Sequence, residues 1–476
     1  MEGYKKMKQV SSILCLRRPV LGIFADSLIC LIVSWLFLFS DVFASTYHVR
    51  TDGNNNCNGL TDAAGLSGNC AFRTVLKGIQ TAVGGDNVIV HTGNYTGEAL
   101  ASVRSGSSGS LIAIQAATGE IISISRISIT HNYNVISGFV LTLPGGWNSG
   151  AVQLTGSFNQ AINNTVLGNN RGDSGYGNAF GIAGNNNTVS YNIIDGQRNA
   201  ADKSFTWAFH IGGNYNEITH NLIKDTNSIE RVFELYGTYN HIAYNEVSNV
   251  AWTIGGGSHP DLFQVFGSND SYGHVIENNY FHDFDGQLGN LETSGGIKDN
   301  WIFRNNIFAN ITSAFFGHWG TLYFYNNTFY RTSYASNGTN LIFGAYGGTA
   351  TPISNAFIAC GTSASNGWYD SGVANADYNF VSNTPTGGTK SGFSEVHGRN
   401  GGNPLLTAVY DNCVANVCDF RPRSGSVLID NGVAVAGFSS DYAGTSRPQG
   451  LRWDIGAFEF IGGTFIPKYP GSILVR

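Results

Sequence analysis

Four polar residues stand at the same place in four short segments that each end in glycine. His210 lies in FHIGG, Glu234 in FELYG, Gln264 in FQVFG and Glu292 in LETSG, each three residues before the glycine. Their neighbours are mostly apolar, so strand alternation would bury the neighbours and turn this polar column outward. Carboxylates, an imidazole and an amide in one line are groups that move protons or bind sugar hydroxyls.

Charged and aromatic residues close to the polar column enlarge the candidate site. Arg231 and Asp261 stand at the same offset from it, which predicts that they are neighbours on successive strands and form an ion pair. Tyr236 and Phe266 lie two residues beyond the column and predict an exposed platform for sugar rings. The other candidate residues lie in the adjoining segments: Trp207, His259, Asp285 and Gln287.

A solvated outer face is the alternative interpretation, because polar residues are mostly exposed. Only 12% of the chain is charged, whereas about a quarter is usual. Glu, His, Asp and Arg nevertheless concentrate in residues 202–304, and the segments on either side have Gly, Ala or Leu at the column position. This concentration favours a functional site.

Glycoside hydrolysis is the first function that these residues predict, because it needs two carboxylates. Glu234 and Glu292 are two segments apart, or about 9.6 Å at roughly 4.8 Å per strand. That separation is near the ~6.5–9.5 Å of inverting enzymes. Asp261 would serve as either partner, and His210 would orient or shuttle a proton.

Two other functions fit the same residues. In a polysaccharide lyase, Glu234, Asp261 and Glu292 would hold Ca²⁺ together with Gln264, and Arg231 or His259 would be the base. An acidic site would repel a uronate without the metal, so this function predicts calcium dependence; no other cofactor is expected. The third function is a non-catalytic carbohydrate-binding or adhesion protein.

The elements that would position this site repeat along the chain. In each repeat, an Asn precedes or interrupts an apolar stretch. The eight intervals between these Asn residues, from Asn164 to Asn379, average about 27 residues. The repeated residues are Asn164, Asn192, Asn221, Asn245, Asn279, Asn306, Asn327, Asn355 and Asn379. Such a period predicts a solenoid. With a Gly-ended strand before each Asn, the pattern predicts three short strands per coil and an Asn ladder at one bend.

We therefore expect an all-β chain folded as a right-handed, single-stranded parallel β-helix with a cap at each end. Residues 45–110 would hold an N-terminal cap and the first coil, residues 111–400 the rungs, and residues 401–476 a C-terminal cap. The segment FRTVLKGIQTAV predicts a capping helix, because Val75, Ile79 and Val83 share one face.

Both ends of the repeat carry a resemblance to known proteins. TYHVRTDG, CAFRTVLKGIQ and DNVIVHTGNY resemble the beginning of bacterial pectate-lyase-like β-helix proteins, and SGSVLIDNG and RWDIGAFEF resemble an ending common in that group. The resemblance implies an active face along the outside of the strand set that holds the polar column. The polygalacturonase motifs NTD, DD, HG and RIK are absent as a set, as is the DPHE motif of alginate epimerases. The resemblance therefore implies a fold and leaves the reaction open.

Residues 1–44 predict an export signal, because a basic start precedes the apolar run from Ser27 to Phe43. A retained membrane anchor is the alternative, although 17 residues including Asp41 are few for a span. Removal of these residues would take away five of 26 basic and three of 32 acidic residues, leaving a net charge of −8. We expect a secreted or periplasmic protein with a polysaccharide as partner, no nucleic acid and no membrane; the oligomeric state stays open.

Five cysteines would remain after removal of the signal, and export permits disulfides. The short spacings predict Cys57–Cys70 and Cys413–Cys418 bonds and leave Cys360 unpaired.

Overall fold

The structure is a computed structural model that describes residues 44–142, 150–168, 177–198, 206–227, 229–252, 260–291, 295–318, 320–332, 344–345, 348–361 and 373–462. Nearly all of the expected export signal, residues 1–43, lies outside this range. None of the described helices is long and apolar enough to cross a membrane.

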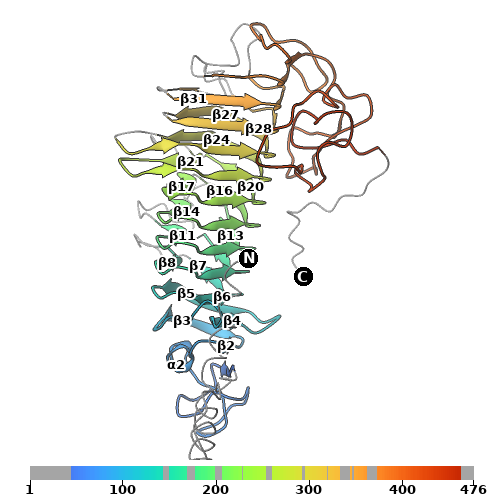
Figure 1. Cartoon of the computed structure of the whole chain (residues 1–476). Coiled ribbons are helices and arrows are strands. Elements are labelled where there is room, and N and C mark those ends of the chain that lie inside the picture. The colour runs from blue at the N-terminus through green and yellow to red at the C-terminus, as the bar shows by residue number, and fades with distance from the viewer. Residues whose placement is uncertain are drawn as a thin grey trace, which may run out of the picture. The chain divides into compact units, whose positions relative to one another are not determined.

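The predicted parallel β-solenoid is confirmed: strands from successive rungs stack in register, and they pair in parallel throughout the stack (Figure 1). One face is a twelve-strand sheet: β1 (Thr46–Val49), β2 (Asn87–Val90), β4 (Ile112–Ala116), β6 (Asn134–Ser137), β9 (Gln160–Ile162), β12 (Thr188–Ser190), β15 (Glu217–Thr219), β19 (His241–Ala243), β23 (Val275–Glu277), β26 (Trp301–Arg304), β28 (Thr321–Tyr325) and β31 (Thr349–Ile353).

The site sheet is the set of strands that carries the polar column. It contains β8 (Val152–Leu154), β11 (Asn178–Ile182), β14 (Trp207–Ile211), β17 (Arg231–Leu235), β21 (Asp261–Val265), the second halves of β24 (Tyr280–Leu291) and β27 (Ile307–His318), and β30 (Gly344–Ala345).

The strands that follow the Asn bend form the third face. They are β7 (Val140–Thr142), β10 (Thr165–Leu167), β13 (Ile193–Asp195), β16 (Leu222–Asn227), β20 (Glu246–Ala251), the first halves of β24 and β27, β29 (Thr328–Tyr330), β32 (Ala356–Ile358), β33 (Phe380–Ser382) and β34 (Arg399–Asn400). The long strands β24 and β27, with β3 (Gly93–Ala101) and β5 (Ile122–Ile129), run from this face into the site sheet. The short strands β18 (Gly237–Thr238), β22 (Ser271–Tyr272) and β25 (Lys298–Asp299) pair at a corner.

The predicted Asn ladder is confirmed at the bend after the twelve-strand sheet. Asn245 is typical: its Nδ2 donates to Ile218 O at 2.8 Å and to Asn279 Oδ1 at 3.0 Å, and its Oδ1 accepts from Asn221 N at 2.9 Å. The same contacts recur from Asn164 to Asn379, and all nine ladder residues are buried. Each amide thereby satisfies backbone groups that a buried bend would otherwise leave without partners.

A second ladder, which the sequence analysis missed, lies at the preceding bend. It contains Asn134, Asn159, Asn187, Asn216 and Asn240, each of whose backbone N–H donates to the next rung. The last acceptor is Nδ1 of His274, at 3.1 Å from Asn240 N. Burial lowers the pKa of His274 to about 3, so the ring stays neutral and can accept.

Glycines at the site-sheet corners are required by close approach of the backbone. A Cβ on Gly184 would lie 1.9 Å from Gly156 O, and a Cβ on Gly213 would lie 1.9 Å from Gly184 O. A side chain at these corners would therefore collide with the backbone of the preceding rung, which explains why each of these strands ends in glycine.

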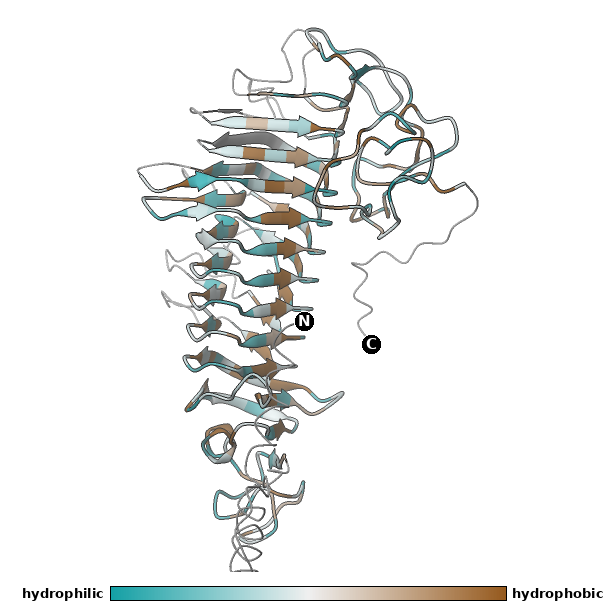
Figure 2. Cartoon of the chain, in the orientation of Figure 1, coloured by the Kyte–Doolittle hydropathy of each residue, from teal (hydrophilic) through white to brown (hydrophobic). Residues whose placement is uncertain are grey.

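The interior is a stack of apolar side chains. Phe180, Phe209, Phe233 and Phe263 lie one above another with centroids 5.3–5.4 Å apart, and each is fully buried. Figure 2 shows the hydrophobic residues repeating along successive strands of the stack. This packing keeps the alternation of inward and outward residues the same from rung to rung.

A short helix, α2 (Val75–Thr81), confirms the predicted helical segment, with Thr74 as N-cap. Val75 and Ile79 are buried in the main core, as expected. Val83 lies beyond the helix end and is 41% exposed, so its expected place on the buried face is wrong. The helix stops because Ala82 already has extended backbone angles.

The C-terminal region, residues 401–462, packs along the flank of the later rungs and includes β35 (Leu406–Ala408) and β36 (Asp419–Pro422) (Figure 1). Phe420 and Tyr442 form a second core with outward-facing Ile307, Tyr330 and Ile358. The predicted cap over the end of the stack is not confirmed, because these apolar outer faces lie on the flank and draw the region there.

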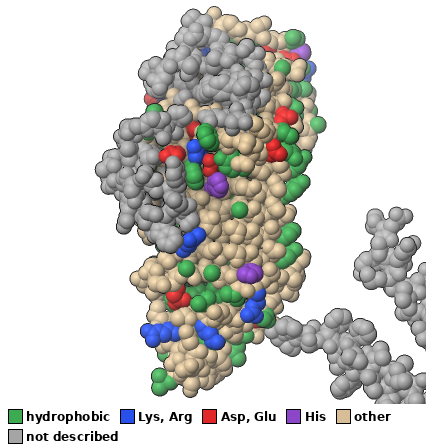
Figure 3. Space-filling model, turned by 90° about the vertical axis from the view of Figure 1, so that its left-hand side faces the viewer, with side chains coloured by type: hydrophobic (Ala, Val, Ile, Leu, Met, Phe, Trp, Pro, Cys, Tyr) green, Lys and Arg blue, Asp and Glu red, His purple; other side chains and the backbone are tan. Residues whose placement is uncertain are grey.

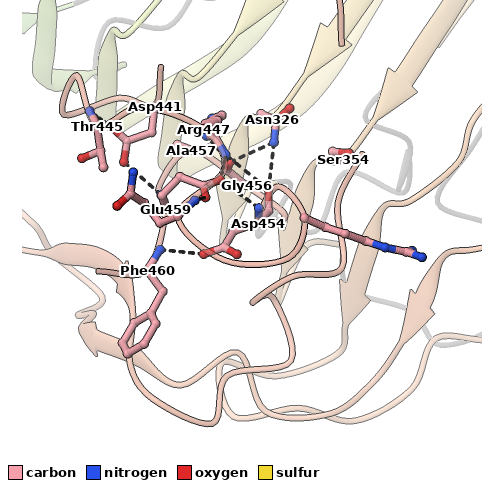
Figure 4. A network of polar contacts seen from close by, with 12 residues as sticks. Asn326, Ser354, Asp441, Thr445, Arg447, Asp454, Gly456, Ala457, Glu459 and Phe460 are labelled. Carbon is pink, nitrogen blue, oxygen red and sulfur yellow. Dashed lines mark hydrogen bonds and ion pairs between the residues drawn. The ribbon is translucent and has the colours of Figure 1, made fainter. Parts of the chain in front are cut away.

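A buried polar network fastens this region to the rungs (Figure 4). Arg447 Nη1 donates to Glu459 Oε1 at 2.7 Å, and both side chains are fully buried. Asn326 Nδ2 donates to Asp454 O at 2.9 Å, and the Asp454 carboxylate accepts from Phe460 N at 2.6 Å. The predicted Cys57–Cys70 and Cys413–Cys418 disulfides are confirmed, and Cys360 is free and buried.

Asp454 should make the protein less stable as the pH rises. Burial raises the pKa of this carboxyl to about 7, against about 3.9 for an unfolded Asp. Between these values the folded chain holds a proton that the unfolded chain has lost. Stability therefore falls by up to about 1.4 kcal/mol per pH unit and levels off above the folded pKa. We expect Asp454→Asn to remove this slope in denaturant unfolding measured across the range; parallel curves for wild type and variant would contradict the assignment.

Candidate functional site

The polar column is confirmed as far as Gln264. His210 on β14 pairs with Glu234 on β17, and Glu234 pairs with Gln264 on β21. The next position is Asn290 on β24, not the predicted Glu292. Counting back three residues from Gly295 placed the column two residues too late, because Asn290 stands five residues before that glycine. Glu292 itself lies outside the described residues, as does His259.

A second line of polar residues runs beside the column on the same strands. Trp207 pairs with Arg231, Arg231 with Asp261, and Asp261 with Gln287. The expected adjacency of Arg231 and Asp261 is confirmed, while their ion pair stays a prediction. Asp261 and Gln287 are 2% and 9% exposed, so this line is largely covered.

Glu234 is the centre of the described site and is 3% exposed. Its Oε1 accepts from Arg231 Nη1 at 3.1 Å and from the Tyr236 hydroxyl at 2.9 Å, and its Oε2 is hydrogen-bonded to His210 Nδ1. A solvent-exposed Glu234 was expected and is wrong, because these three side chains cover the carboxylate. A buried carboxylate of this kind remains stable only while these hydrogen-bonding side chains stay in place.

Arg231 ties the two polar lines together. Besides Glu234 it contacts Gln264, to whose Oε1 it donates through Nε. Its guanidinium lies 5.4 Å from the centroid of the Trp207 ring, a cation–π distance. Trp207 is therefore both a wall of the site and a support for Arg231.

His210 is the part of this network that reaches solvent, with a side chain 36% exposed. Trp207 stacks on its ring at 5.4 Å, and Tyr236 meets the ring edge-on at 5.6 Å. With Nδ1 bonded to a buried carboxylate, the imidazole presents Nε2 for proton transfer, in the arrangement by which a carboxylate orients a catalytic histidine.

The predicted aromatic platform is only half present. Phe266 is 55% exposed, whereas Tyr236 is partly buried against the main core. Burial, with the adjacent Glu234 carboxylate, raises the pKa of the Tyr236 phenol. Tyr236 is thus a protonated hydrogen-bond donor to Glu234, and the expectation of an open stacking surface is wrong for it.

Asp285 has a structural position at the bend within β24. Its Oδ1 accepts from Thr312 Oγ1 at 2.9 Å, and its Oδ2 accepts from Trp252 N at 3.2 Å. These bonds hold neighbouring rungs together, so the predicted contact of Asp285 with substrate has no support from its geometry.

The described part of the site does not fit calcium. Both Glu234 oxygens already accept hydrogen bonds from side chains, and Arg231 Nη1 lies 3.1 Å from Oε1. Within the described parts of the chain, Glu234 and Asp261 do not belong to any group of three metal-ligating atoms within 4.8 Å. Of the predicted Ca²⁺ ligands, Glu234 and Asp261 are therefore not part of a metal-ligating group among the described residues, and Glu292 lies outside them.

Figure 3 looks onto the side of the stack where the site sheet lies in Figure 1. A histidine, acidic and basic groups and hydrophobic side chains gather in the upper half of this face, and the area directly below is mostly uncharged.

No protein-family model and no curated protein matches the chain. Among solved structures, XylC in complex with xylose has a TM-score of 0.54 and 11% identity, covering 87% of this chain and 98% of that one. Pectate lyase Pel9A has a TM-score of 0.46 and 17% identity, covering 88% and 97%. The alginate lyase AlyGC of family PL6 has a TM-score of 0.46 and 12% identity, covering 73% and 54%. The similarity to XylC extends over most of both chains and supports the parallel β-helix fold described above.

The pairing of Arg231 with Glu234 should be energetically coupled. Arg231→Met keeps part of the packing on Trp207 but leaves a buried carboxylate without its cation, a change that costs about 3 kcal/mol in comparable buried pairs. In Glu234→Gln the neutral amide no longer needs the cation, so adding Arg231→Met should cost much less. A double-mutant cycle from urea unfolding measures this coupling; additive effects would show that the two side chains act independently.

Proposed function

We propose that the chain is a polysaccharide-active enzyme that cleaves uronate-containing polymers by β-elimination, with His210 as the base. One observation carries the proposal: His210 is the solvent-reaching end of a buried network formed with Glu234, Arg231 and Tyr236. A buried network of this kind holds one side chain in one orientation and tautomer, which is what general-base catalysis requires.

The reaction needs little beyond these groups. His210 Nε2 takes the proton from C5 of the uronate, the electron pair forms the C4–C5 double bond, and the C4–oxygen bond breaks. The Glu234 carboxylate stabilises the imidazolium formed at His210. When the leaving oxygen lies on the same side of the ring, the imidazolium returns the proton to it, so the base is regenerated.

Arg231 supplies the positive charge near the reacting sugar. Its Nε and Nη1 are bound to Gln264 and Glu234, and its side chain is 17% exposed. A uronate carboxylate beside this guanidinium would be attracted by its positive charge. Phe266, 55% exposed, offers an apolar surface for a neighbouring sugar ring.

Hydrolysis by two carboxylates is less well supported. Glu234 and Asp261 are 3% and 2% exposed, and Glu234 has both oxygens engaged by protein groups. A hydrolase of this kind needs both carboxyl groups to reach the glycosidic bond. XylC, a solved structure with the same fold, was determined in complex with xylose, so this fold can bind a saccharide. Export directed by residues 1–44 would bring the chain into contact with extracellular polymers.

The test is a panel of neutral and uronate polysaccharides, assayed with and without a calcium chelator. We expect both new reducing ends and the ultraviolet absorbance of unsaturated uronates, and we expect activity to persist in the chelator. His210→Gln should reduce the rate by about 10²–10⁴-fold, the usual contribution of a general base.

His397→Gln is the matched control, because His397 Nδ1 is likewise bonded to a carboxylate, at 2.7 Å from Asp377 Oδ2, outside the site. It should leave the rate unchanged. Reducing ends without the absorbance would make the enzyme a hydrolase. Retention on an immobilised polysaccharide without turnover would make it a binding protein, and either result contradicts the proposal.

A further inference from the structure

Three side chains with metal-ligating atoms converge at the N-terminal end of the stack. His48 is on β1, His91 follows β2 directly, and Asp62 belongs to the loop between these strands. His48 Nδ1 lies 3.0 Å from His91 Nε2, which lies 3.4 Å from Asp62 Oδ1. One atom from each residue falls within 4.8 Å of the other two.

The surroundings prepare His91 to act as a ligand. Its second ring nitrogen, Nδ1, lies 3.1 Å from Glu120 Oε1, and Glu120 Oε2 accepts from Thr92 N at 2.5 Å. A carboxylate that accepts the Nδ1 proton leaves Nε2 unprotonated and facing the cluster, as in many metal-bound histidines.

The third ligand, Asp62, is also held in place. Arg50 Nη1 donates to Asp62 Oδ1 at 2.9 Å, which holds this carboxylate oxygen beside His91 Nε2.

We propose that His48, His91 and Asp62 form a zinc site that joins the first two rungs to the disulfide-closed loop between them. Two imidazoles and one carboxylate are ligands that suit Zn²⁺, whereas Ca²⁺ and Mg²⁺ prefer oxygen alone. Tetrahedral zinc with bonds of about 2.0–2.1 Å separates its ligand atoms by roughly 3.3 Å. The two measured separations, 3.0 and 3.4 Å, bracket that distance.

The site would stabilise the N-terminal end of the described stack. β1 is the terminal strand of the twelve-strand sheet; one edge pairs with β2, and the other edge is hydrogen-bonded to the loop residues Gly59 and Phe72. A metal shared by both rungs and by the loop closed through Cys57–Cys70 links elements that otherwise separate when the end frays. This role is independent of the polysaccharide reaction proposed above.

A metal-free explanation exists for the same geometry. The two rings stack at 5.3 Å with an interplanar angle of 18°, and a neutral pair can share one hydrogen bond. A metal-free histidine pair would have no specific affinity for zinc, so a measurement of zinc binding distinguishes it from the proposed site.

The test is calorimetric titration of the chelator-stripped full chain with zinc chloride, with calcium chloride as the second probe. We expect saturable binding of one zinc per chain at this site, a higher unfolding temperature with zinc, and no effect of calcium. Cobalt(II) at the same site should give the visible absorption of a tetrahedral complex.

Variants assign the binding to these residues. His91→Gln should abolish the zinc-dependent rise in unfolding temperature, and Glu120→Gln, which retains every direct ligand, should weaken binding by about 10–100-fold. His131→Gln, whose ring is bonded to Ser102 and Thr130, should bind as the wild type. Circular dichroism of each variant without metal shows whether it is folded. Absence of saturable binding in the wild type, or wild-type affinity in folded His91→Gln, would overturn the proposal.

Discussion

The buried side-chain amides at the two bends are the interaction on which the rest of the structure depends. A solenoid of parallel strands can slip in register, and a slip of one residue would turn every outward side chain inward. In this chain an Asn such as Asn245 binds backbone groups of the preceding rung and the side-chain amide of the next. Displacing one rung would therefore leave several buried polar groups without partners, each at a cost of about 1–3 kcal/mol.

The candidate site follows from that register. His210, Glu234 and Gln264 are 24 and 30 residues apart in the chain, yet they form one column because the bends below them are aligned. Arg231 can reach both Glu234 and Gln264 only while these rungs keep their relative positions. The Asn ladders thus preorganise the site, because they hold the hydrogen-bonding partners of the buried Glu234 carboxylate in place before a substrate binds.

Much of the architecture was predictable because it repeats. The Asn period, the glycine corners and the column from His210 to Gln264 all rest on spacing that one rung shares with the next. The second ladder could also have been found, since Asn159, Asn187, Asn216 and Asn240 each stand five residues before a ladder Asn. His274 holds the same offset from Asn279 and continues the ladder as an acceptor.

The remaining features depend on contacts that no repeat encodes. Glu292 was placed wrongly because Gly295 stands five residues after the column position and not three, and a local insertion cannot be distinguished from a shifted motif by counting. Glu234 is buried because the side chains of Arg231, His210 and Tyr236 are long enough, and directed so, that they cover it. The C-terminal region lies on the flank because apolar residues face outward on β27, β29 and β32. Alternation alone predicts which way a side chain points and not what covers it.

The most direct test of the account is a crystal structure of the inactive His210→Gln variant soaked with a uronate oligosaccharide. The account predicts a sugar on the outer face of the site sheet, with C5 of one uronate facing residue 210 and its carboxylate within hydrogen-bonding distance of Arg231. An oligosaccharide bound to the twelve-strand sheet, or to the site sheet away from residue 210, would contradict it.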